Sequence, residues 1–198
     1  EPALERGSGP PGRTRGVRMV RLAGKRSLAL AVVAALVWGS LPPQAFALPQ
    51  GGTAVHGDWD VNGDVPGRLV VAQHSDRLIV DWISFSIAAG ETVHFDQELH
   101  QVVLNRVTGG VRSDIYGTLT AGGQIFLLNP QGVLIHPEGR IDVGGLLATS
   151  LSISEEDFLA GRYRFDSSGE VMSVENYGEI VAGFGPDKSG GYVVLLAP

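Results

Sequence analysis

The stretch DWDVNGD, which begins at Asp58, has the clearest spacing for metal chemistry in this 198-residue sequence. Asp58, Asp60 and Asn62 stand at positions 1, 3 and 5 of a calcium-binding loop, and a glycine follows at position 6. Position 12 is Leu69, where such a loop needs a glutamate that binds the ion through both oxygens. The ligand set is therefore incomplete, and we favour a β-hairpin that turns at Asn62-Gly63.

Other residues that could perform catalysis are scattered. The five histidines form no i, i+4 pair and no HExxH motif, and the sequence has neither cysteine nor a GxSxG nucleophile motif. A glycosidase needs two facing carboxylates, and Glu138 and Asp142 flank one strand-like run. Two solvated side chains on an outer face would have the same spacing. We expect no catalytic residue, no metal site and no cofactor.

Charge divides the chain into two parts. Residues 1–47 carry seven Lys/Arg and two acidic side chains, whereas residues 48–198 carry eight basic and nineteen acidic ones. Such a break in charge indicates a processing boundary. The acidic balance of the second part argues against nucleic acid as a partner, because phosphates attract basic surfaces.

The first part has the pattern of a signal peptide. Residues 28–38 are uncharged and follow Lys25-Arg26, and this run is too short to span a bilayer, which takes about 20 residues. The small side chains of Ala45 and Ala47 predict cleavage after Ala47. If Met19 is the true start, the signal has 29 residues; the alternative is a long basic n-region. We expect an exported protein without stable membrane insertion.

Residues 48–198 predict short strands wound in a coil. Short β-rich runs alternate with Gly, Asn, Asp and Pro. Two series of apolar residues are spaced by eight, and both lie on one strand face: Ile125, Val133 and Ile141, and Leu127, Ile135 and Val143. Three such strands advance about 24 residues, which fits one turn of a three-sided parallel β-helix. An antiparallel sandwich is the alternative, although its strands normally carry polar residues on one face.

Three further expectations concern the corners, the outer face and the one helix. Glycines that could supply positive φ stand at the expected corners: Gly123, Gly132, Gly139 and Gly144. Leu128 and Leu134 are apolar on the opposite parity, so we expect a hairpin from the N-terminal part to cover one outer face. Ser154 and Asp157 resemble a capping box that opens a short helix, which stops at Gly161.

The run before Pro198 is β-like and has no closing polar cap, so we expect a longer chain. The absence of cysteine has two explanations for an exported protein. A core of about 150 residues can be large enough without disulfides. Alternatively, the chain must stay unfolded through an oxidising compartment, where a disulfide would lock it prematurely. The sequence alone leaves both explanations open.

Several motifs in order resemble one known family. They are LPQGG (48–52), VDWISFSIAAGETVHF (80–95), LNRVTGG (104–110), GQIFLLNPQGVLI (123–135), VGGLLATSLSIS (143–154) and EEDFLAGRYRF (155–165). The chain from about residue 48 to 198 resembles the N-terminal domain of filamentous-haemagglutinin-like proteins, the exported partners of two-partner secretion (TPS). The resemblance implies an all-β fold: a right-handed parallel β-helix, or solenoid, with an N-terminal cap and an extra-helical β-hairpin.

The resemblance also implies a function. In this family the domain enters the periplasm, where POTRA domains of a cognate outer-membrane β-barrel transporter recognise it before it folds. It then crosses the barrel and folds outside as the start of a secreted or surface protein. Adhesion or haemagglutination, through a host-cell receptor or glycan, belongs to downstream regions. The alternatives are a β-helical carbohydrate-active enzyme, such as a polysaccharide lyase, and a self-contained binding module.

The family's secretion motif, Asn-Pro-Asn-Gly-Ile/Leu, reads Asn129-Pro130-Gln131-Gly132-Val133 here. Gln131 replaces an asparagine, which tolerates a left-handed turn better, so we expect the turn to depart from the family geometry. A second motif, Asn-Pro-Asn-Leu, is missing, as in the branch with high-molecular-weight adhesins and haem-acquisition proteins. In LNRVTGG, Asn105 and Arg106 are candidates for transporter recognition. The alternative is that all these residues only shape the fold.

Overall fold

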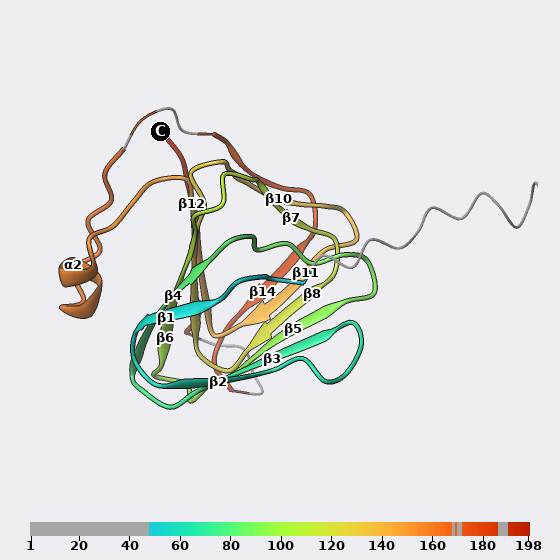
Figure 1. The fold of residues 1–198 in the computed structure, drawn as a ribbon. Coiled ribbons are helices and arrows are strands. Elements are labelled where there is room, and N and C mark those ends of the chain that lie inside the picture. Colours follow the sequence, from blue (N-terminus) through green and yellow to red (C-terminus); the bar gives the residue numbers. More distant parts are fainter. Residues whose placement is uncertain (1–47, 168, 170–171, 186–189) are drawn as a thin grey trace, which may run out of the picture. The chain divides into compact units, whose positions relative to one another are not determined.

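The computed structural model describes residues 48–167, 169, 172–185 and 190–198, and these residues wind into a coil of short strands (Figure 1). The predicted signal peptide lies outside the described residues. No helix among the described residues is long and apolar enough to cross a membrane.

Three sheets form the sides of the coil. Sheet 1 contains β1 (Thr53–His56), β4 (Arg77–Trp82), β6 (Val102–Val107), β9 (Gln124–Leu128), β12 (Gly145–Thr149) and β15 (Val193–Leu196). Sheet 2 contains β7 (Ser113–Ile115), β10 (Val133–Ile135) and β13 (Val174–Asn176). Sheet 3 contains β2 (Trp59–Asn62), β3 (Arg68–Gln73), β5 (Thr92–Asp96), β8 (Thr118–Ala121), β11 (Arg140–Val143) and β14 (Glu179–Ala182).

The order of the strands confirms the three-sided parallel coil. The chain passes from β9 in sheet 1 to β10 in sheet 2 and β11 in sheet 3, then returns to sheet 1 as β12, parallel to β9. Ile125 pairs with Leu146, so this coil advances 21 residues rather than the expected 24. Parallel connections of this kind are right-handed in about 98% of cases, which agrees with the handedness implied by the family.

Antiparallel ladders between the named strands of the described chain lie at its N-terminal end. β1 pairs antiparallel with β4, and β2 pairs antiparallel with β3. These two strands close the first coil and form the expected N-terminal cap. Every other named ladder is parallel, so the antiparallel sandwich was the wrong alternative.

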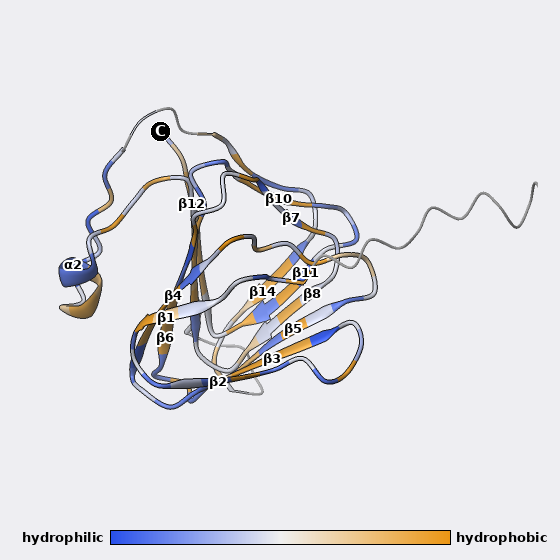
Figure 2. Cartoon of the chain, in the orientation of Figure 1, coloured by the Kyte–Doolittle hydropathy of each residue, from blue (hydrophilic) through white to orange (hydrophobic). Residues whose placement is uncertain are grey.

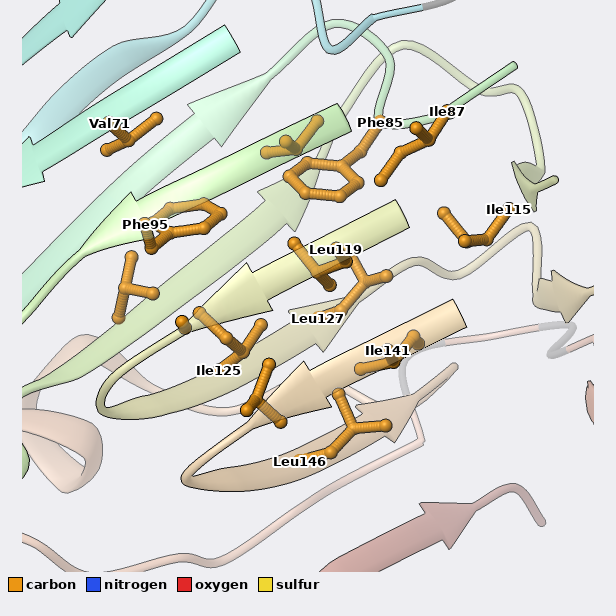
Figure 3. Packing of buried hydrophobic residues seen from close by; sticks show 14 of the residues in the cluster. Val71, Phe85, Ile87, Phe95, Ile115, Leu119, Ile125, Leu127, Ile141 and Leu146 are labelled. Atoms are coloured by element: carbon orange, nitrogen blue, oxygen red, sulfur yellow. The ribbon is translucent and has the colours of Figure 1, made fainter. Parts of the chain in front are cut away.

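The interior confirms the apolar series with spacing of eight. All six residues of that series are buried in one core cluster, together with larger side chains such as Phe85 and Phe95. Side chains from successive strands stack along the inside of the coil, as Leu119 and Ile141 do (Figure 3). Each fully buried aliphatic side chain of this size stabilises the fold by about 1.5–3 kcal/mol. The repetition of apolar pairs in every coil is therefore the main reason for the fold.

The corner glycines serve a different purpose from the one expected. Of the four, only Gly132 has a positive φ, of 92°. A Cβ atom at Gly139 would lie 2.4 Å from the carbonyl oxygen of Ile115 in the preceding coil, and one at Gly123 would lie 2.4 Å from that of Gln101. Because real Cβ atoms do not approach so closely, glycine is needed where the backbones of successive coils touch.

The outer face of sheet 1 is covered by a segment from later in the chain. Residues 150–167, here called the strap, contain the helix α2 (Glu155–Leu159), which begins at Ser154 and lies beside sheet 1 (Figure 1). Ser154 Oγ accepts a hydrogen bond from the Asp157 amide at 3.1 Å, which confirms the predicted cap. Two backbone hydrogen bonds of 2.9 Å between Ser152 and Asp166 close the strap at its base.

This arrangement corrects the expected position of the cover. Leu128 is buried under the strap, not under a hairpin from the N-terminal part, and Leu134 is only half-buried. The extra-helical segment is a loop that contains α2 and is closed by one antiparallel bridge, where the family resemblance implied a β-hairpin. The helix begins with three acidic residues and ends with two apolar ones (Figure 2), of which Phe158 is buried against the sheet.

Candidate functional site

The DWDVNGD segment forms a hairpin loop. The Asn62 side-chain oxygen accepts a hydrogen bond from the Asp64 amide at 2.9 Å, and His74 lies 3.0 Å from Asp60. The connection from β2 to β3 runs from residue 63 to 67 and has its positive φ at Gly67, so the two-residue turn at Asn62-Gly63 was wrong. Within the described ranges, no group of three or more histidine and acidic side chains could hold a metal ion.

The two carboxylates considered for glycoside cleavage lie on the surface. Glu138 is exposed in the turn before β11, and Asp142 is exposed on the outer face of β11. Arg140, between them on the same strand, forms an ion pair with Glu179 of β14. Such exposed ion pairs between neighbouring strands contribute modestly to stability.

Asn129 connects three layers of the coil and is only 1% exposed. Its side-chain amide donates to the Val111 carbonyl and to Ser113 Oγ, both at 2.9 Å. Its side-chain oxygen accepts from the Gln131 amide at 2.9 Å, and its backbone N–H donates to the Thr149 carbonyl. With these bonds the side chain is fully used within the folded domain. The geometry thus gives Asn129 a structural part in the fold.

The turn that follows Asn129 is closed by a backbone hydrogen bond. The Gly132 amide donates to the Asn129 carbonyl at 2.8 Å, which closes a four-residue turn with Pro130 second and Gln131 third. Asparagine, proline and glycine at the first, second and fourth positions are those that a type I turn favours. The third position of such a turn is right-handed, and the positive φ falls on Gly132. Such a turn needs no left-handed residue at Gln131, whose side chain is exposed.

Asn105 is buried inside the coil with 0% exposure. Its side-chain oxygen accepts a hydrogen bond from the Trp82 indole at 2.9 Å, and its amide donates to the Phe126 carbonyl at 3.3 Å. These partners belong to β4 and β9, the strands on either side of β6. Asn105 therefore joins three strands of sheet 1, and a partner of the folded domain cannot reach it.

Arg106 follows directly and points to the outer face of sheet 1. Its guanidinium donates to both carboxylate oxygens of Asp81, at 2.6 and 3.1 Å, and to Glu155 in the strap at 2.9 Å. Burial lowers the pKa of Arg106, but the hydrogen bonds to Asp81 and Glu155 outweigh burial and raise the pKa above its ordinary value. The Arg106 side chain is 23% exposed, so its charge is largely used to hold the strap.

A groove of about 380 Å³ brings the two sequence motifs together. Its lining residues are Asp81, Arg106, Val107, Thr108, Leu128, Pro130, Leu151, Ser152 and Ile153. Arg106 and Pro130 thus share one groove, whereas Asn105 and Asn129 lie below it in the buried interior. No local pattern of residues predicts that the strap lines this groove, because its place over sheet 1 depends on contacts between distant parts of the chain.

A second polar cluster on sheet 2 was also absent from the sequence analysis. His136 donates to Asp114 at 2.9 Å and stacks on Tyr116, with ring centroids 3.5 Å apart. Arg112 donates to the same carboxylate at 2.7 Å. Burial raises the pKa of Asp114, but the bonds from His136 and Arg112 outweigh burial and lower the pKa below 3.8. The ladder between β7 and β10, which brings the cluster together, joins residues about 20 positions apart.

A parallel β-helix with an antiparallel N-terminal cap and an Asn-Pro-x-Gly turn is the architecture expected of a two-partner secretion domain. The model of the TPS secretion domain family matches residues 52–197, and the chain belongs to this family. Members are exported proteins that cross the outer membrane through a cognate transporter, and the family is a secretion domain rather than an enzyme family.

Relatives and a solved structure agree with this assignment. The chain is 37% identical over 118 residues to a heme/hemopexin-binding protein of Haemophilus influenzae, covering 59% of this chain and 13% of that protein. It is 39% identical over 113 residues to the heme/hemopexin-binding protein of the Rd strain, covering 57% of this chain and 12% of the relative. The crystal structure of the HMW1 secretion domain from Haemophilus influenzae superposes with a TM-score of 0.65 at 31% identity, covering 68% of this chain and 37% of that one.

Proposed function

We propose that residues 48–198 are the targeting domain of a larger exported protein, released from a signal peptide by cleavage after Ala47. In this proposal the POTRA domains of an outer-membrane β-barrel recognise the domain in the periplasm. The observation that carries the proposal is the family match over residues 52–197 of a chain that spans only 13% of one curated relative. Long proteins that use the same kind of transport step are expected to share one short domain that the transporter recognises.

The fold supports a role in starting the β-helix outside the cell. β1 and β2 close the first coil, and each later strand of sheets 1 and 3 pairs with the strand one coil before it. Stability in such a stack comes largely from neighbouring coils, so folding can start at the capped end and add one coil after another. Folding outside the membrane would then bias the chain outward without an added energy source.

Burial determines whether a transporter could contact each motif residue before or after the domain folds. Asn105 and Asn129 are inaccessible in the folded domain, so a transporter can contact their side chains only before the domain folds. Gln131 is exposed and could be contacted in either state. An unfolded segment can bind by adding a strand to a sheet edge, where main-chain hydrogen bonds supply the affinity.

The activity of the whole protein belongs to regions outside this domain. The curated relatives are named as heme/hemopexin-binding proteins, and the structural relative is the secretion domain of HMW1. We propose that the full-length product acts after secretion in one of two ways. It either binds a haem carrier or performs adhesion or haemagglutination through a receptor or glycan on a host cell.

The test is transporter-dependent export. The full chain is expressed with and without a cognate POTRA-bearing barrel, and its amounts in medium and periplasm are measured. Export should require the barrel and should stop when residues 48–198 are removed from a longer fusion. Export that is equal without the barrel would refute the proposal.

A binding experiment then assigns the motif. Purified POTRA domains are titrated with the urea-unfolded chain after rapid dilution, using wild type, Asn129→Ala and Asn105→Ala. If a variant binds more weakly than wild type while the chain is still unfolded, the POTRA domains recognise that asparagine side chain directly. Equal binding by all three would leave these asparagines with a structural role alone.

A further inference from the structure

The strap is attached to strands that precede it by long stretches of chain. Arg77 in β4 donates from Nη1 to the Phe158 carbonyl at 2.9 Å, across 81 positions of sequence. The same guanidinium lies 5.4 Å from the centroid of the Phe158 ring and 6.0 Å from that of Tyr163. Arg77 thus holds the C-terminal end of α2 by a hydrogen bond and by cation–π contacts.

A second arginine holds the other end of the helix. Arg106 in β6 donates to Glu155, the first residue of α2, across 49 positions. Arg106 also bonds both oxygens of Asp81 in β4, so it links two strands of sheet 1 with the strap. The two arginines therefore fix the two ends of one short helix onto neighbouring strands.

Between these contacts the strap covers an apolar surface that spans four strands. The covered side chains on β4, β6, β9 and β12 are Ile79, Val102, Leu104, Phe126, Leu128 and Leu147, each at most 5% exposed. Phe126 packs against Phe158 with ring centroids 5.8 Å apart and against Tyr163 at 4.9 Å. Tyr192, just before β15, also packs against this cluster. Without the strap, the surface would lose the cover of Phe158 and leave an apolar patch exposed, which monomeric proteins rarely tolerate.

The strap is inserted between two coils of the chain. It follows β12 directly and precedes β13, and it lengthens the step from β10 to β13 to 41 residues, against 20 from β7 to β10. Its contacts need β4, β6, β9 and β12 in register, because the two arginines and the apolar partners are spread over these four strands. Contacts over such separations carry a high loop-closure entropy and form late.

We infer that the strap is an intramolecular clamp that joins β4, β6, β9 and β12 into one cooperative unit. In the export process this step would convert a reversible stack of coils into a stable leading unit outside the membrane. That consequence rests on the proposed function, whereas the clamp itself is a property of the folded chain.

Hydrogen exchange of the purified chain tests the clamp. Phe158→Ala removes the side chain at the centre of the covered surface. Amides of β4, β6, β9 and β12 should then exchange at least tenfold faster, while amides of β3, β5 and β8 in sheet 3 keep most of their protection. The matched control is Phe95→Ala, an equally buried phenylalanine of β5 outside the strap contacts, which should weaken sheet 3 at least as much as sheet 1. Faster exchange in the strap alone would overturn the inference.

A gentler pair of variants covers the case in which Phe158→Ala does not fold. Glu155→Gln removes only the strap partner of Arg106, and Arg106→Met removes both of its ion pairs. In the wild-type background, Glu155→Gln should raise the equilibrium constant for local opening of sheet 1, measured by hydrogen exchange, about two- to threefold. In the Arg106→Met background it should leave that constant unchanged. Equal effects in both backgrounds would contradict the clamp. These measurements need no transporter, so the clamp and the export function can fail independently.

Discussion

Two buried asparagines have both their donor and their acceptor groups satisfied inside this coil. Asn105 bonds to the neighbouring coils through Trp82 and Phe126, and Asn129 donates to the preceding coil and accepts from Gln131 in its own turn. A buried polar side chain stabilises a fold only when its hydrogen-bonding groups are satisfied. Such bonds also fix the register, because a shift by one residue would place the amide among apolar side chains.

Asn129→Ala should lower the free energy of unfolding by about 3 kcal/mol, because the substitution leaves the buried Ser113 Oγ without its donor and removes the bonds to the Val111 carbonyl and the Gln131 amide. Gln131→Ala in the same turn is the control, since this side chain is exposed and should change stability by less than about 0.5 kcal/mol. Urea denaturation followed by tryptophan fluorescence measures both. Equal stability of the two variants would show that Asn129 is dispensable for the fold.

Protonation of Asp114 should lower the stability of the domain in acid. Its pKa is lower in the folded chain than the ordinary 3.8, so its contribution is complete above about pH 5 and is lost as the pH falls through the folded pKa. Protonation removes an acceptor from His136 and Arg112. Asp114→Asn should therefore lose less stability than wild type between pH 5 and pH 3, measured by urea denaturation at each pH. Parallel curves for the two proteins would contradict this assignment.

At the corners of the coil, the sequence pattern predicts where glycines lie but not why glycine is needed there. The glycine positions were found correctly, but the explanation by positive φ held only for Gly132. The close approach of successive backbones depends on how coils stack, and no local pattern of residues reveals that distance. The same limit applies to the strap, whose cap at Ser154 was predicted but whose contacts with Arg77 and Arg106 were not.

Gly139→Ala should destabilise the domain by about 2–4 kcal/mol, a size usual for overpacking where a neighbouring coil must move. The added Cβ would lie 2.4 Å from the Ile115 carbonyl oxygen and 3.0 Å from that of His136. Gly63→Ala is the control, because a Cβ there meets only a leucine methyl at 3.7 Å. Thermal unfolding by circular dichroism compares the two. A tolerated alanine at Gly139 would mean that the stacking distance can relax.

Ser154→Ala should weaken the strap by about 1 kcal/mol, the usual cost of removing a helix N-cap that accepts from the third helical residue. The loss should be visible as faster hydrogen exchange in Glu155–Leu159 and as easier proteolysis within the strap. Ser167→Ala, at the exposed end of the same segment, should leave both unchanged. Unchanged exchange in both variants would show that packing of Phe158 alone determines the helix.

For the chain as a whole, the sequence was sufficient for the class of fold and for the family. Apolar pairs repeat in every coil, and their spacing is visible without structure, as with Ile125 and Leu127. The groove that joins Arg106 with Pro130 was not visible, because it lies between sheet 1 and a strap that docks from elsewhere. Short-range periodicity thus defines the coil, whereas long-range contacts define the surface that a partner would meet.

The N-terminal end of the coil has open strand edges that acidic side chains protect. β2 is the edge strand of sheet 3. Its acidic Asp60 side chain is 85% exposed, and the apolar Val61 that follows is also exposed. A charge on an edge strand discourages pairing with a second chain. Residues 48–198 as a whole are strongly acidic, which adds a longer-range repulsion between copies at low salt.

Asp60→Val should therefore increase self-association, because the edge becomes an apolar strand with unpaired backbone groups. Sedimentation velocity over a range of protein concentrations measures the shift from monomer toward larger species. Glu138→Val makes the same change of charge and adds the same side chain at an exposed turn, where no strand edge is open, and should stay monomeric. Association by both variants would attribute the effect to lost charge. Association by Asp60→Val alone would identify the edge of β2 as the surface that the acidic side chain guards.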